Sequence, residues 1–349
     1  MGAAEASARD ECRVEKRVRM VEVAGALPAS VRTSIDVETM VSQSGGTFRP
    51  RRGIIEALSG VRARRVAGCE EQCSDLAVNA CRQVLQRSGV SLESIDLLIF
   101  ASAGQDLIEP ATAHIVQSKL GTRCPVFDVK NACNSFLNGV QLAESLIASG
   151  ANKNVLVAVG EISSRGIAWH ADSLNDFKRN MPGYTMGDAG AAALFSATND
   201  GGGIFYRKFA SLSEHWELTT VLSGGSMHPR GAEHSYIRAN SPRLKLAFRD
   251  IGLPFLRGAL NEAGVQFADF KRIFVHQVSL PYLNDMLAES GIPVSKVEIT
   301  VADLGNLAAA TIPVALARAR DRGTIERGDR IMCLGLASGI SIGVLMMDF

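Results

Sequence analysis

Short apolar runs that alternate with longer helical patterns place the strongest constraint on what this chain can fold into. Ile95–Ala101 and Asn154–Val159 are apolar almost without interruption, as strands buried on both faces are. Helical patterns over Ala111–Leu120 and Cys133–Ser149 separate them, with a short strand pattern at Val126–Val129. This alternation predicts an α/β protein with a mostly parallel sheet that helices cover on both faces.

The second half repeats this order of elements without repeating its letters. Its helical patterns cover Leu244–Ala263, Leu280–Ser290 and Leu307–Arg318, and its strand patterns cover Arg272–Val275, Arg330–Leu334 and Ile340–Met347. A length of 349 residues suits two packed halves, since a domain usually holds about 100–200 residues. We predict a flexible tail over residues 1–17, an N-terminal half over 18–200 and a C-terminal half over 201–349. Asn199-Asp200-Gly201, at the junction, is a hairpin-turn sequence.

One polar stretch, Arg165–Met186, interrupts the alternation. Aromatic residues such as Phe177 and Tyr184 are scattered through it. A structureless segment of this length is uncommon and often functional. The sequence leaves two interpretations open, a lid or binding loop and a surface excursion or dimer contact.

Charge and hydropathy exclude several classes of function. The formal net charge of +1 offers no basic surface for nucleic acid. No apolar run reaches the roughly 18 residues that a membrane span needs, and the N-terminal residues lack the apolar stretch of a signal peptide. We therefore expect a soluble, cytoplasmic protein that binds neither nucleic acid nor membrane.

Cysteine usage and glycine spacing argue against metals and cofactors. The seven cysteines are odd in number and irregular in spacing, which favours reduced thiols. Cys69 and Cys73 stand four apart, but no second pair follows at zinc-ligand spacing. No strand is followed by a phosphate-binding Gly-x-Gly-x-x-Gly that opens a helix. We expect no metal and no cofactor.

Three residues are candidates for chemistry because of where they fall in the pattern. Cys133 lies between a strand and an apolar helix, where free N–H groups and the helix dipole would favour its thiolate. His276 ends the strand Arg272–Val275, and ligand sites in α/β sheets gather at the carboxyl ends of strands. Asn306 stands at a helix start. Each also has an ordinary interpretation: a buried small side chain, a structural histidine or an N-cap.

The order of these residues in their context resembles β-ketoacyl-acyl-carrier-protein synthase III and its relatives, from about Val21 to the end. The motifs that carry the resemblance are Ser59-Gly60-Val61-Arg62-Ala63-Arg64-Arg65, Asn131-Ala132-Cys133 with Phe136, Gly187-Asp188-Ala189-Gly190-Ala191-Ala192, His276-Gln277, Gly305-Asn306 with Pro313, and the closing Gly335–Gly343. The resemblance implies a thiolase fold of two similar halves, each a mixed sheet between helices, packed as five α-β-α-β-α layers. It also implies a homodimer.

The resemblance also implies an activity and the residues that perform it. Cys133 would take an acyl group from an acyl-CoA or acyl-carrier-protein thioester, and a Claisen condensation would join that group to a second thioester. His276 and Asn306 would donate to the carbonyl of the second thioester, and the N–H groups of Cys133 and Ser338 would form the oxyanion hole for the first. One such donor is worth about 3–4 kcal/mol in the transition state.

The chain departs from the enzyme that initiates fatty acid synthesis at several places. Ile54 and Leu58 stand where that enzyme has a tryptophan and an arginine for coenzyme A, and Pro281 replaces its basic docking residue. Ala337-Ser338-Gly339 replaces a triple glycine.

Glu109 is a further departure, because it is a carboxylate where the initiating enzyme has an uncharged residue. Its surroundings are similar to those of head-to-head condensing enzymes of olefin and α-pyrone pathways, in which the matching glutamate reaches the partner's site as a base. Such a base suits a condensation without loss of CO₂. Three alternatives stay open: a carboxylate that only favours a helix start, a decarboxylating malonyl-using synthase, and acyl transfer to an alcohol or amine.

Overall fold

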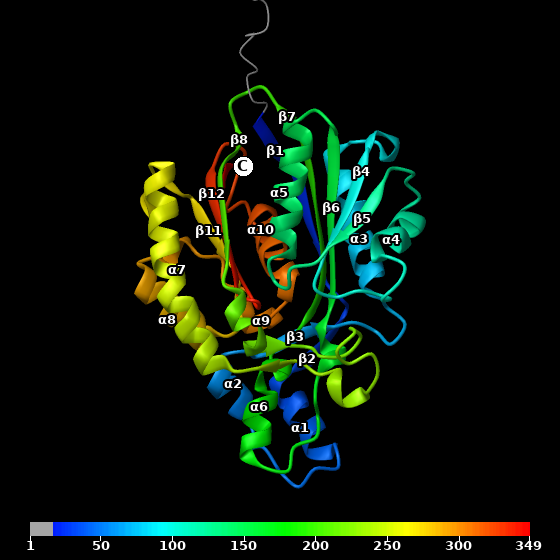
Figure 1. Ribbon diagram of the computed structural model, residues 1–349, viewed down its shortest axis with the longest axis vertical. Helices are drawn as coiled ribbons and strands as arrows, with labels where there is room; N and C mark the ends of the chain where they lie inside the picture. Colours follow the sequence, from blue (N-terminus) through cyan, green and yellow to red (C-terminus); the bar gives the residue numbers. More distant parts are fainter. Residues whose placement is uncertain (1–16) are drawn as a thin grey trace, which may run out of the picture.

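The computed structural model describes residues 17–349, which fold into five layers (Figure 1). From one side to the other, the layers are the helices α7 (Ser241–Ala263) and α8 (Leu280–Ser290); the sheet of β11 (Arg272–Val275), β12 (Arg330–Ala337), β13 (Ser341–Asp348) and β8 (Gly203–Ser211); the helices α5 (Ser135–Ala148) and α10 (Thr311–Asp321); the sheet of β1 (Arg17–Ala26), β7 (Asp188–Thr198), β6 (Asn154–Ile162), β4 (Leu97–Ala101) and β5 (Val126–Val129); and the helices α3 (Cys73–Ser88) and α4 (Thr112–Leu120). This arrangement confirms the predicted five-layer α/β fold.

Both sheets are mixed, so the prediction of a mostly parallel sheet is wrong. β6, β4 and β5 run parallel to one another, but β7 is antiparallel to both β1 and β6. In the second sheet β11 and β12 are parallel, whereas β13 is antiparallel to both β12 and β8. Helices cover both faces, so antiparallel strands here are as continuously apolar as parallel ones. An apolar run therefore does not report strand direction.

The turn at Asn199-Asp200-Gly201 does not close a hairpin, which corrects a second expectation. β7 ends at Thr198 and pairs with β1 and β6, whereas β8 begins at Gly203 and pairs with β13. The turn thus connects the two sheets. β1 and β6 already pair with the two edges of β7, so β8 cannot pair with it.

Side-chain alternation along the closing strands sets the two faces of the second sheet. A Cβ at Gly335 on β12 would lie 1.9 Å from Asn134 Oδ1, so this residue faces α5. Leu334 and Leu336, one position either side, belong instead to the cluster under α7 and α8. The central helix α5 is buried through Phe136, Leu137 and neighbours, each worth roughly 1.5–3 kcal/mol when fully covered.

The polar stretch Arg165–Met186 is ordered, which corrects the expectation of a structureless excursion. It forms a short turn and then α6 (Leu174–Tyr184), at the bottom of Figure 1 beside α1 (Ser34–Gln43) and α2 (Ile54–Ser59). Phe177 and Tyr184 are fully buried and pack against each other at 5.2 Å between ring centroids. The scattered aromatics form the core of this small extension.

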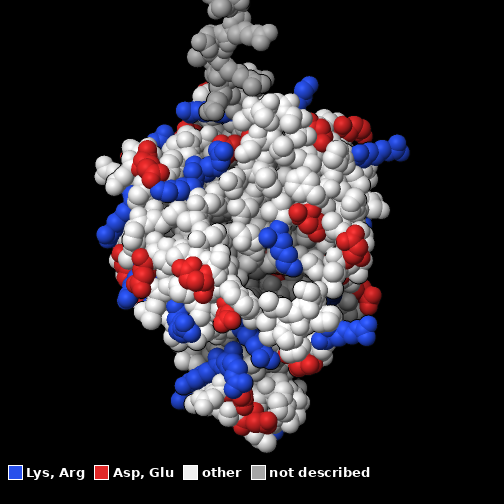
Figure 2. Space-filling model, viewed as in Figure 1, with Lys and Arg blue, Asp and Glu red and all other residues white. Residues whose placement is uncertain are grey.

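The expected tail, residues 1–17, lies outside the described residues except for Arg17, which begins β1. The boundary between halves at residue 200 stays a prediction. No helix between residues 17 and 349 is long and apolar enough to cross a membrane. Figure 2 shows positive and negative side chains interspersed around the rim of one face.

Candidate active site

Cys133 lies in a tight turn between β5 and α5. Ala132, directly before it, has a φ of 47°, a left-handed conformation that costs a non-glycine residue about 1–3 kcal/mol. Hydrogen bonds hold the turn, since Ser135 Oγ donates to the Ala132 carbonyl at 2.7 Å and accepts from the Asn131 N–H at 2.8 Å. α5 begins at Ser135, so Cys133 stands just before the helix rather than in its first turn.

The Cys133 thiol is neutral in this setting, which differs from the thiolate expected. Burial, and to a lesser extent the charge of Glu161, raise the pKa of Cys133 to about 12. The expected effect of the helix dipole is about 1 kcal/mol, whereas the desolvation of a buried charge costs several. The thiol must therefore lose its proton as a substrate arrives.

The turn between β12 and β13, which carries Ser338, is tied to the Cys133 turn. Asn134 Nδ2 donates to the Ser341 carbonyl at 3.0 Å and to its hydroxyl at 2.9 Å. Asn134 is fully buried. Gly335 leaves the room that Asn134 occupies, because any larger residue would overlap it. This contact brings the two predicted donors of the first oxyanion hole, the N–H groups of Cys133 and Ser338, to the same region.

His276 follows β11 and is buried, with its N–H donating to the Leu334 carbonyl of β12 at 3.0 Å. Burial lowers the pKa of its imidazole to about 4, so the ring is neutral near pH 7. Nδ1 has no partner within the described residues. A neutral imidazole still donates from one ring nitrogen, so this ring can bind a carbonyl oxygen.

Asn306 is held by hydrogen bonds on both sides. Its N–H donates to the Thr185 carbonyl at 2.8 Å, and its carbonyl accepts from the Gly187 N–H at 3.0 Å. Its Oδ1 accepts from the N–H of Ala308, whose φ of 48° makes it the second left-handed non-glycine residue of the site. With Oδ1 engaged, the side chain has Nδ2 as its donor.

Glu161 is a site residue that the sequence analysis missed. It lies near the end of β6, is fully buried, and accepts hydrogen bonds from the loop that follows β4. A charged residue in the apolar strand Asn154–Ile162 was a signal that could have revealed it. Its charge acts on Cys133, so it lies within electrostatic range of the nucleophile.

Glu109 is placed differently from the other candidates. It lies on the connection between β4 and α4, residues 102–111, which we call the 102–111 loop, and its side chain is exposed. Leu107 and Ile108 beside it are 52% and 68% exposed. A single chain therefore leaves Glu109 in solvent, and the burial expected around it is absent from one copy.

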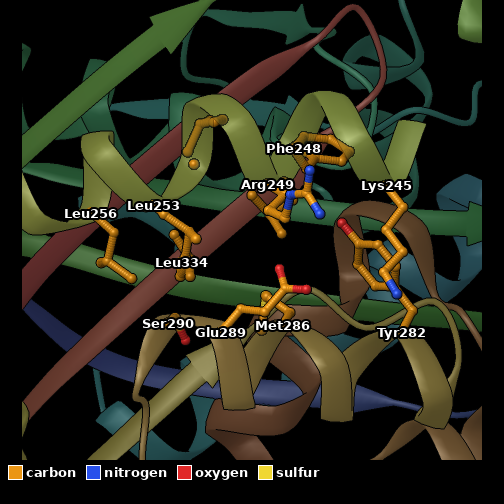
Figure 3. Close-up of a pocket in the computed structure, with 13 residues that line it drawn as sticks. Lys245, Phe248, Arg249, Leu253, Leu256, Tyr282, Met286, Glu289, Ser290 and Leu334 are labelled. Atoms are coloured by element: carbon orange, nitrogen blue, oxygen red, sulfur yellow. The ribbon is translucent and has the colours of Figure 1, made fainter. Parts of the chain in front are cut away.

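A small cavity opens between α7 and α8, away from this chemistry (Figure 3). α7 contributes Phe248 and Leu253, α8 contributes Met286, and Leu334 of β12 closes the bottom. Leu334 points to the face of the sheet opposite Asn134. The cavity is thus separated from Cys133 by the sheet, and we assign it no part in the reaction.

These residues lie at or near the ends of strands in both sheets. Cys133 follows β5, Glu161 lies near the end of β6, His276 follows β11 and Ser338 follows β12. Carboxyl ends of strands are where α/β sheets form their sites. Among residues 17–349, no group of three or more His, Cys, Asp or Glu side chains is placed to hold a metal ion. The arrangement offers a thiol, two sets of hydrogen-bond donors and a buried carboxylate.

Comparison with known proteins decides the family. The model for 3-oxoacyl-[acyl-carrier-protein] synthase III matches residues 127–212, and the model for its C-terminal part matches residues 260–349. The β-ketoacyl-[acyl-carrier-protein] synthase III of Symbiobacterium thermophilum is 31% identical over 342 residues, which cover 95% of this chain and 98% of that protein. The chain belongs to the β-ketoacyl-[acyl-carrier-protein] synthase III family. It is therefore an acyl-condensing transferase.

Two further matches agree with this family. The β-ketoacyl-[acyl-carrier-protein] synthase III of Fusobacterium nucleatum is 30% identical over 323 residues, covering 91% of this chain and 94% of that protein. The crystal structure of Xanthomonas campestris OleA with bound cerulenin superposes with a TM-score of 0.85 at 24% identity, covering 96% of this chain and 97% of that one. The second match confirms the synthase III fold and no more. The roles of Cys133, His276, Asn306, Ser338 and Glu109 stay predictions.

Proposed function

We propose that this synthase III family member joins two acyl thioesters head to head, without decarboxylation, with Glu109 as the base. Cys133 takes the first acyl group, His276 and Asn306 hold the second thioester carbonyl, and the N–H groups of Cys133 and Ser338 hold the first. Each substrate is an acyl thioester of coenzyme A or of acyl-carrier protein. The enzyme works as a homodimer, and Glu109 serves the partner's site.

The placement of Glu109 is the observation that carries this proposal. The carboxylate stands in solvent directly after exposed Leu107 and Ile108, on a loop whose first residues are bonded to Glu161. Exposed apolar residues grouped in this way favour contact with another protein surface. A second copy would cover them and bring Glu109 into an active site.

The chemistry balances with these groups. The Cys133 thiol loses its proton, and its sulfur attacks the first thioester carbonyl and expels the carrier thiol, which takes up a proton. Glu109 then removes the α-proton of the second thioester, while His276 and Asn306 stabilise the enolate oxygen. The enolate carbon attacks the acyl group on Cys133 and releases the sulfur as a thiolate. The thiolate takes up a proton and Glu109 returns its proton to solvent, so both groups are restored and the product is a β-keto thioester.

A decarboxylating synthase is the second candidate, because the relatives at 30–31% identity are named β-ketoacyl-[acyl-carrier-protein] synthase III. In such an enzyme a malonyl thioester loses CO₂ to form the enolate, and no base is required. OleA, the structural neighbour, has been crystallised with bound lauric acid and lauroyl-CoA. Acyl transfer to an alcohol or amine by Cys133, His276 and Asn306 is a third candidate.

Product analysis with matched substrates tests the proposal. The enzyme is incubated with an acyl-CoA alone, and in parallel with the same acyl-CoA plus labelled malonyl thioester. We expect a β-keto product from the acyl-CoA alone, detected by mass, with no CO₂ released in step with product. Release of labelled CO₂ in equal amount to product, with none from the acyl-CoA alone, would establish the decarboxylating reaction instead.

A further inference from the structure

Glu161 is a buried group whose charge acts on the nucleophile, and the reaction scheme above gives it no part. Its side chain is 1% exposed, near the carboxyl end of β6. Burial of a carboxylate is unfavourable unless hydrogen bonds compensate for the lost water. Its bonding therefore shows what it is placed to do.

The Glu161 carboxylate connects three segments that are distant in sequence. Oε1 accepts from the Ser102 hydroxyl at 2.9 Å and from the Ala103 N–H at 2.7 Å, and Oε2 accepts from the Gly104 N–H at 2.9 Å. The Ala309 N–H, three residues after Asn306, also donates to it. One side chain thus fastens the start of the 102–111 loop and the segment after Asn306 to β6.

We propose that Glu161 is a positioning residue that sets the places of Glu109 and Asn306 relative to Cys133. The inference rests on the proposed function for the role of Glu109, but the electrostatic effect of Glu161 on Cys133 does not. A displacement of about 1 Å at a reacting group costs on the order of 10²-fold in rate. Since Glu161 holds the root of the 102–111 loop, its bonds determine where Glu109 stands.

The electrostatic surroundings of Glu161 supply an independent readout. Burial raises the pKa of Glu161 to about 7, against the opposing effect of its hydrogen bonds. The ionisable groups that its charge affects are the thiols of Cys133 and Cys73, and Asp106 and Asp188 also act on Cys73 from neighbouring segments. Ionised Glu161 disfavours the Cys133 thiolate, so removal of its charge changes the reactivity of Cys133.

The test compares Glu161→Gln, Glu161→Asp and the control Glu38→Gln. Glu38 is also a buried carboxylate that accepts two backbone N–H groups, from Gly53 and Ile55, but it holds α2 rather than the Cys133 region. Two quantities are measured for each folded variant. One is the rate of iodoacetamide alkylation at Cys133 as a function of pH, by peptide mapping. The other is the rate of acyl loading and of condensation, measured separately.

For Glu161→Gln we expect faster alkylation of Cys133 above about pH 7, by roughly threefold or more, which corresponds to half a pKa unit. Below that pH the alkylation rates of the variant and of wild type should converge, because Glu161 of wild type is then protonated and, like the glutamine, carries no charge. A merely loosened site would react faster at every pH. Glu161→Asp keeps the charge and loses reach, so its alkylation profile should match wild type while condensation slows.

Both Glu161 variants should slow condensation by at least about tenfold more than they slow loading, whereas Glu38→Gln should change the two rates equally. An alkylation profile unchanged in Glu161→Gln, or equal effects in the Glu161 and Glu38 variants, would overturn the inference. Alkylation requires no second substrate, so that result stands even if the enzyme proves to be decarboxylating and the proposed function fails.

Discussion

Two regions of the molecule differ in how firmly contacts within a single chain fix them. One contains Cys133, His276 and Asn306, and the other is the 102–111 loop. Each of the three sits in a segment fixed by hydrogen bonds, through the Asn134–Ser341 contact, the His276–Leu334 bond and the Thr185–Asn306–Gly187 bonds. In the loop, Gly104 is anchored on Glu161, but Leu107, Ile108 and Glu109 are exposed. Under the proposed function, acyl loading needs groups that one chain already holds in place, whereas condensation needs Glu109, which a second copy would have to position.

The largest effect is expected where loading begins. Cys133→Ala should abolish acyl loading and all turnover, because no other group in the site is a nucleophile. Intact mass after incubation with acyl-CoA, followed by peptide mapping, measures this. Cys69→Ala is the control, since Cys69 is an exposed free cysteine. A label found on Cys124 or Cys333 in wild type, with none on Cys133, would show that the nucleophile is misassigned.

Removal of the second set of donors should separate the two half-reactions. We expect His276→Ala and Asn306→Ala each to slow condensation by roughly 10²–10³-fold, the usual loss for one oxyanion donor, and to load Cys133 at a substantial rate. Because burial lowers the pKa of His276 to about 4, the imidazole stays neutral as the pH falls towards that value, and the contribution of His276 to condensation should not change with pH near neutrality. Single-turnover assays measure each step.

A folded variant of either residue that cannot load at all would contradict this division of labour. Circular dichroism and the melting temperature show whether the variant is folded. The result would mean that His276 and Asn306 bind the carbonyl of the first thioester. The site would then have one oxyanion hole rather than two.

The exposed region is tested by Glu109→Gln, which keeps the shape of the side chain and removes its charge. We expect normal loading of Cys133 and condensation slowed by roughly a hundredfold, within the usual range for a positioned base. Glu93→Gln is the control, as another exposed glutamate of the same half. Sedimentation should show a homodimer in every case. A catalytically active monomer, or a Glu109→Gln variant that condenses as fast as wild type, would show that the 102–111 loop needs no second copy to do its part.

Local patterns in the sequence predicted elements and missed their relations. The strand Val126–Val129 and the helix Leu280–Ser290 were predicted to the residue, because their ends carry local signals. The direction of β7 was not predicted, since pairing depends on strands far away in sequence. The neutral state of Cys133 was missed for a similar reason. The burial that removes water from the thiol depends on segments far away in sequence, whereas the helix dipole is evident from residues next to Cys133 in sequence.

The smallest expected effect concerns the link between the Cys133 turn and the Ser338 turn. Ser341→Ala removes one of the two acceptors of Asn134 Nδ2 and leaves a buried N–H unpaired. We expect a loss of about 1 kcal/mol in the free energy of unfolding, or a few degrees at most in melting temperature. Loading should slow by only a few-fold, because the Ser341 carbonyl still accepts from Asn134 and the Ser338 N–H shifts little. Ser145→Ala is the matched control, since its exposed hydroxyl bonds only within α5 to the Gln141 carbonyl. If Ser341→Ala melts and loads as Ser145→Ala does, the hydroxyl contact does not hold the turn, and the fixed region owes its rigidity to packing around Gly335 instead.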